Sequence, residues 1–147
     1  MAQFGRPSAD TSIGGYTDQA GGTTNIYATI DEVVASDADY IRSVVAPANA
    51  PYVTKFTALE DPVSSSGHVL RCRMAKDAAG GATINATVQL RQGYVNEAGQ
   101  GTLIATIPNT ANVGETFTDY THTLSGAEAD AITDYASLYI RIVANQA

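Results

Sequence analysis

Apolar and polar side chains alternate in two neighbouring segments, residues 69–75 and 83–91. A period of two is typical of strands that bury one face and expose the other. A glycine-containing turn lies between the segments, so we expect them to pair as an antiparallel hairpin. A shift of one residue would bury arginines, because it would move every side chain to the opposite face. The register that avoids this sets Leu70 opposite Val88, Cys72 opposite Ala86 and Met74 opposite Ile84.

Similar patterns predict further strands over residues 24–31, 52–59, 102–107, 117–124 and 137–143. The last of these places Leu138, Ile140 and Ile142 on its inward side. Ser125 and Glu128 have the spacing of a capping box, which predicts a short helix over residues 127–132. Ser36 can cap a second helical turn that runs to Arg42.

These elements predict an all-β fold, an antiparallel β-sandwich that is jelly-roll-like and carries one or two short helices. Residues 1–24 contain several glycines and few large apolar groups, which indicates an extended N-terminal arm with turns. We therefore expect an arm over residues 1–24 and a sandwich domain over residues 25–147. A chain of 147 residues is long enough to bury a core without disulfide bonds.

The composition argues against two classes of partner. Fifteen acidic and eight basic residues give a formal charge of −7, which disfavours contact with nucleic acid. No apolar run approaches the roughly 20 residues that cross a bilayer, so we expect no membrane partner. The first residues lack a basic and then apolar signal segment, which predicts synthesis in the host cytoplasm without a signal peptide.

The sequence offers little catalytic chemistry. His68 and His122 lie outside metal-ligand spacings and nucleophile motifs, and Cys72 falls on the apolar side of its strand. His122 is expected to be a hydrogen-bonded, partly buried ring. We therefore predict no enzyme, no cofactor and no metal. One alternative is a calcium loop that uses Asp31, Glu32, Asp37 and Asp39. The spacing of these residues differs from the ligand order of a recognised calcium loop.

Six residues are candidates for an interface. Arg71, Arg73 and Arg91 should share the outward face of the hairpin and form a basic stripe on an acidic protein. This stripe is either a docking surface for an acidic partner or a solvated strand face. The other candidates are Arg6 in the arm and two tyrosines that could stack on a sugar ring, Tyr16 and Tyr94.

Several motifs together resemble small β-rich proteins encoded among the structural genes of tailed phages and prophages. The resemblance covers nearly the whole chain. Tyr16 departs from it, because we expect tryptophan there. The motifs are Arg6-Pro7, residues 13–16, residues 27–32, SDADYI at 36–41, GHVLRCR at 67–73, residues 90–93, LIAT at 103–106 and ITDYASLYIRIVA at 132–144.

The resemblance implies a virion component that is neither an enzyme nor a cofactor-binding protein. It implies a capsid decoration, or cement, protein on the outside of the head, with the major capsid protein as its partner. By analogy it also implies a homotrimer. The alternatives are a carbohydrate- or receptor-binding module of a fibre or tail, and an internal or tail-tube assembly component.

Overall fold

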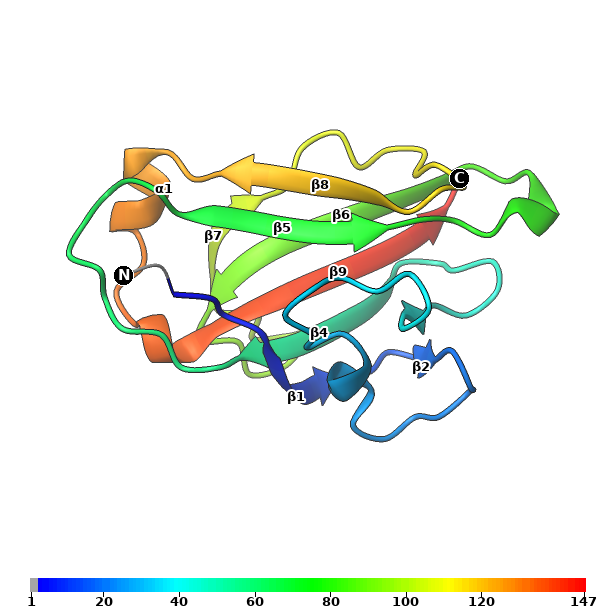
Figure 1. The fold of residues 1–147 in the computed structure, drawn as a ribbon, viewed down its shortest axis with the longest axis horizontal. Coiled ribbons are helices and arrows are strands. Elements are labelled where there is room, and N and C mark those ends of the chain that lie inside the picture. Colours follow the sequence, from blue (N-terminus) through cyan, green and yellow to red (C-terminus); the bar gives the residue numbers. More distant parts are fainter. Residues whose placement is uncertain (1–2) are drawn as a thin grey trace.

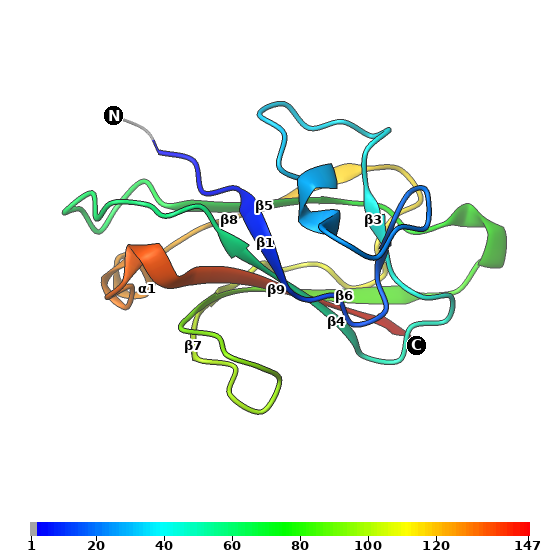
Figure 2. The same ribbon diagram turned by 90° about the horizontal axis from the view of Figure 1, so that it is seen from below.

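The computed structural model describes residues 3–147 as two facing layers of antiparallel strands (Figure 1). Figure 2 shows the smaller layer above the larger one. The smaller layer pairs β5 (Val69–Met74) with β8 (Thr118–Thr123). The larger layer is a five-stranded sheet that consists, in spatial order, of β1 (Pro7–Ser12), β4 (Ala50–Phe56), β9 (Leu138–Gln146), β6 (Ile84–Gln92) and β7 (Thr102–Thr106).

Short elements connect these strands. β2 (Thr17–Asp18) pairs with β3 (Ile41–Arg42) in a small ladder of its own. The helical elements are η1 (Ile26–Thr29), η2 (Ala78–Gly80), α1 (Gly126–Asp130) and η3 (Tyr135–Ser137).

The predicted all-β class is confirmed, and so are most of the strands. The segments predicted over residues 52–59, 102–107, 117–124 and 137–143 appear as β4, β7, β8 and β9 with small differences at their ends. The capping box is also present, because Ser125 accepts the Glu128 amide and Glu128 accepts the Ser125 amide at 2.7 Å. The jelly-roll arrangement is not confirmed, since the two layers hold five strands and two strands.

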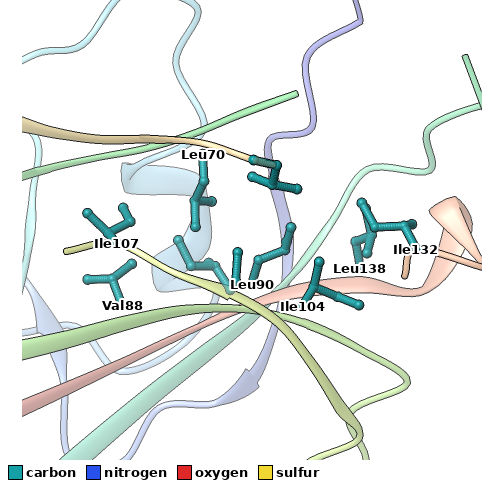
Figure 3. Close-up of a cluster of buried hydrophobic side chains, with 10 residues drawn as sticks. Leu70, Val88, Leu90, Ile104, Ile107, Ile132 and Leu138 are labelled. Carbon is teal, nitrogen blue, oxygen red and sulfur yellow. The ribbon is translucent and has the colours of Figure 1, made fainter. Parts of the chain in front are cut away.

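The predicted hairpin is wrong, although both of its strands exist. β5 pairs with β8, and β6 pairs with β9 on one side and with β7 on the other. The connection through η2 therefore crosses from one layer to the other. Leu70 of β5 and Val88 of β6 belong to the same buried cluster, but they meet across the layers (Figure 3). Two strands with alternating apolar and polar residues can pair within one sheet or face each other from two sheets. Either arrangement buries the apolar face of each strand, so the sequence pattern fits both.

The main core lies between the two layers. Its buried members come from both sheets, from the residues directly after β7 and β8, and from the segment after α1, which contributes Ile132 (Figure 3). Cys72, Met74 and Ile142 are partly buried and pack against this cluster. Cys72 therefore occupies the apolar side of its strand, as predicted, and burial raises the pKa of its thiol to about 12.

A second apolar cluster anchors residues 13–30, and the structure of this region corrects two predictions. The expected arm is part of the five-stranded sheet from Pro7 onward, because β1 pairs with β4. The strand expected over residues 24–31 is instead the helix η1. Asp10 of β1 explains this helix, since its carboxylate accepts the amides of Ile26 at 2.7 Å and Tyr27 at 2.9 Å. The buried members of the cluster are Tyr16, Ile26, Ala50, Tyr52 and Ala144.

The helical turn expected from Ser36 to Arg42 is also absent. Residues 31–46 form an irregular loop whose only regular element is β3. Ser36 accepts the Ala38 amide at 3.3 Å, but no helix follows. The loop is held elsewhere by side-chain contacts to the smaller layer, which are described below.

Candidate interaction surface

A groove of about 1950 Å³ opens between the two layers. Ligand pockets for small molecules are commonly about 300–1,000 Å³, so this groove has room for something larger. The smaller layer is only two strands wide and cannot cover the whole inner face of the five-stranded sheet. The groove occupies part of the uncovered area, and its lining includes Ile140 and Ile142 of β9.

Three segments contribute to the walls of the groove. β5 lines one side with Leu70, Cys72 and Met74. The chain from Gln3 to Pro7 lines another side and is fixed to the loop after β4. Gln3 donates to the Glu60 carbonyl at 3.0 Å and accepts the Glu60 amide at 2.8 Å. The loop of residues 31–46 provides a third part of the lining.

The loop of residues 31–46 is tied to the outward face of the smaller layer by Arg73. Its guanidinium donates to Asp37 of the loop at 2.6 and 2.7 Å, and to Asp119 of β8 at 3.3 Å. The loop also contributes Tyr40, whose ring centre lies 5.9 Å from that of Phe117. The loop is therefore fixed at one end of β5, while residues nearer the start of β5 remain open to the groove.

Five exposed apolar side chains are among the residues that line the groove. The exposed fraction of these side chains ranges from 45% for Val44 to 98% for Val45. We name these groove-lining residues the apolar rim: Phe4, Val33, Val44, Val45 and Val69. Large contiguous apolar patches on protein surfaces commonly mark interaction sites. The rim was not predicted from the sequence, although four of its five residues, all except Val69, are apolar residues outside the predicted strands.

The predicted basic stripe is wrong because its members belong to different sheets. Arg71 and Arg73 lie on β5, whereas Arg91 lies on β6 in the other layer. Arg73 is neutralised by two carboxylates. Arg91 donates to the Gln89 side chain at 3.0 Å and to the Gln100 carbonyl at 3.2 Å. Arg71 is the one exposed residue of the three. It also forms no ion pair within residues 3–147.

The two tyrosines expected to stack on sugars are both buried. Tyr16 is 5% exposed and packs on Tyr52, with 5.6 Å between ring centres. Tyr94 is 3% exposed and packs on Tyr139, with 5.9 Å between ring centres. Neither ring presents a face to a ligand in solution, so the predicted aromatic platform is not formed by these residues.

Arg6, an interface candidate from the sequence, lines the groove. Its guanidinium already has partners within the protein. It donates to the carbonyls of Glu32 and Val33 and lies 5.6 Å from the centre of the Phe4 ring. These contacts join the N-terminal segment to the loop of residues 31–46. Arg6 therefore organises the surroundings of the groove.

The hairpin loop between β6 and β7, residues 93–101, folds across the outer face of the five-stranded sheet (Figure 2). Glu97 holds it there by accepting from Arg141 of β9 at 3.0 Å and from the Tyr94 hydroxyl at 2.7 Å. The Arg141 side chain is only 13% exposed. The hydrogen bond from Arg141 holds the pKa of Glu97 below its ordinary value of 4.5.

We expect this contact to make stability depend on pH. A carboxylate with a depressed folded-state pKa stabilises the fold above its unfolded pKa, and this contribution disappears as the pH falls through the folded value. Stability should therefore fall as the pH drops below about 4.5, and Glu97→Gln should show a shallower dependence. Urea midpoints measured between pH 7 and pH 3 check this. An identical dependence in both proteins would contradict it.

Both histidines are hydrogen-bonded side chains. His122 contacts Glu128 at 3.0 Å, which confirms the expected partly buried, hydrogen-bonded ring. His68 contacts the Tyr135 hydroxyl at 2.8 Å. Among residues 3–147, no three His, Cys, Asp or Glu side chains are placed to hold a metal ion together. The same residues contain no helix with the length and hydropathy needed to span a membrane.

Comparison with protein-family models, with curated proteins and with solved structures finds no match for the chain. The groove, its apolar rim and the charges beside them are the features of the described residues that bear on function.

Proposed function

We propose that this protein is a structural component of a phage virion, most specifically a capsid decoration protein that binds the major capsid protein on the outside of the head. The observation that carries the proposal is the large groove with its apolar rim. A surface of this kind fits a macromolecular partner. The family resemblance in the sequence supplies the kind of partner, and a homotrimer stays a prediction from the same analogy.

The charge distribution is compatible with an external position on the particle. The formal charge of −7 would repel packaged DNA, whereas a site on the outer surface avoids that repulsion. The lining of the groove is close to neutral, whereas the rest of the chain carries three cations and nine carboxylates. The lining carries five of the eight cations and six of the fifteen carboxylates: Arg6, Arg42, Arg71, Arg73 and Lys76 against Glu32, Asp39, Glu60, Asp77, Glu115 and Asp119.

The decisive experiment adds purified protein to particles that lack it. We expect saturable, stoichiometric binding to the head surface, measured by co-sedimentation and located by antibody labelling. Val45→Asp should weaken binding by at least about tenfold, because it places a charge on an apolar contact. Val95→Asp is the matched control, since Val95 is 72% exposed on the hairpin loop outside the groove.

Three outcomes would contradict the proposal. The first is wild-type protein that does not bind such particles. The second is labelling that is confined to the tail or to opened particles, which would instead favour a tail or internal component. The third is equal loss of binding in the Val45→Asp and Val95→Asp variants, which would show that binding does not depend on the groove.

A further inference from the structure

β5 has a free edge that faces the groove. Within residues 3–147, its only strand partner is β8. The Leu124 amide donates to the His68 carbonyl at 2.9 Å, so this opposing pair is hydrogen-bonded. Hydrogen-bonded and non-hydrogen-bonded pairs alternate along an antiparallel ladder. The main-chain groups of Val69, Arg71 and Arg73 therefore point away from β8.

These main-chain groups have no partner among the described residues. No backbone or side-chain hydrogen bond reaches the amide or carbonyl of Val69, Arg71 or Arg73 within residues 3–147. All three residues line the groove. Figure 1 shows β8 along one side of β5, and no described strand pairs with its other side. An unpaired edge of this kind is a template for an added strand.

The groove beneath this edge suits the side chains of such a strand. A strand beside β5 would direct alternate side chains inward, next to Leu70 and Cys72 and toward Ile140 and Ile142. Apolar residues at these positions would cover the exposed part of the inner face. A layer of two strands is marginal by itself, and a third strand would widen its cover over the five-stranded sheet.

The charge of Arg71 beside this edge favours acidic side chains on the outward face of an added strand. Arg71 projects from the outward face of β5 and has no ion-pair partner within residues 3–147, whereas Arg73 already contacts Asp37 and Asp119. The residue opposite Arg71 on an added strand would have its side chain on the same outward face. A carboxylate at that position would pair with the guanidinium.

We propose that β5 binds an extended segment of a partner polypeptide as the third strand of its layer. The segment carries an acidic residue opposite Arg71 and apolar residues on each side of it. This inference rests on the proposed function for the source of the segment, which is then a subunit of the particle. Main-chain pairing supplies affinity in this mode of recognition, and alternate side chains supply specificity.

The test compares two replacements of one residue on the same particles. Arg71→Pro removes an amide that has no partner in the free protein, and proline is tolerated where an edge amide faces outward. We expect it to weaken particle binding by about 10- to 100-fold, because it leaves a carbonyl of the segment unpaired. Arg71→Ala keeps the amide and should weaken binding by only about two- to fivefold.

Hydrogen exchange on the wild-type protein provides a second readout that needs no variant. We expect the amides of Val69, Arg71 and Arg73 to exchange at least about tenfold more slowly on the particle. A synthetic peptide of alternating valine and aspartate should slow the same amides in solution. A peptide with lysine in place of aspartate should have a much smaller effect.

The outcomes separate the two proposals. Particle binding without slower exchange at these amides, and with equal effects of the two variants, would overturn strand addition but keep the decoration function. Absence of particle binding would overturn the decoration function, and the peptide experiment would then decide strand addition alone. Slower exchange at higher protein concentration without particles would identify a second copy as the occupant and overturn the assignment to a partner polypeptide.

Discussion

Replacement of Asp10 by alanine is expected to lower the free energy of unfolding by about 3–5 kcal/mol. The carboxylate accepts three hydrogen bonds, from the amides of Ile26 and Tyr27 and from the Tyr52 hydroxyl at 2.9 Å. The Tyr52 side chain is fully buried, so water cannot replace the lost acceptor without local opening. Urea unfolding of both proteins at neutral pH measures the difference.

Asp18→Ala is the matched control for this substitution. Asp18 also accepts two amides, those of Ala20 at 2.8 Å and Gly22 at 2.7 Å, but both lie in an exposed turn. Its replacement should cost less than about 1 kcal/mol, because water can satisfy the released amides. Equal losses in the two variants would contradict a special role for Asp10 in holding η1 against the sheet.

Replacement of Tyr16 by alanine is expected to cost about 3–5 kcal/mol. The ring is almost fully buried between the turn that carries it and Tyr52. Tyr16→Phe keeps the ring and should cost less than half as much. Thermal or urea unfolding checks both values. A Tyr16→Ala protein with wild-type stability would contradict the placement of this ring in the second apolar cluster.

Asp10 and Tyr16 act on the same neighbour, so their effects should not add. Both contact Tyr52, the first through its hydroxyl and the second through its ring. Residues that share a partner commonly show coupling energies of about 0.5–3 kcal/mol. The double variant should therefore lose less stability than the sum of the single losses.

The positions of most strands could be predicted because they depend on local alternation. β9 illustrates this, since Leu138 and Ile140 are buried and Tyr139 between them is more exposed. Strand partners could not be predicted in the same way. Leu70 and Val88 do meet in one core, but from facing layers, and the alternation in the sequence is identical for either arrangement.

The prediction for the N-terminal region was wrong because the structure of this region depends on contacts with residues far along the chain. Gly14 adopts a positive φ of 50°, and a β-carbon there would lie 1.6 Å from the Pro51 carbonyl oxygen. The glycine therefore indicates a close approach between β4 and the turn that delivers Tyr16 to the core. Glycine-rich composition alone favours an arm, because it carries no information about what lies beside the chain.

The candidate site was only partly accessible from sequence. Arg71 was correctly placed outward on its strand, but Arg73 found a partner in Asp37, which lies 36 residues away along the chain. The groove itself has no local signature. It results from the different widths of the two layers, and those widths depend on pairings between segments that are far apart in sequence.

The central place of β9 has a consequence for biosynthesis. β9 pairs with both β4 and β6, yet it is synthesised after β1, β4, β6 and β7. Until it emerges, β1 with β4 and β6 with β7 have no strand to join them, and their edges are open to other chains. The nascent protein therefore depends on late, long-range pairing, which is slow and leaves time for chaperones to bind.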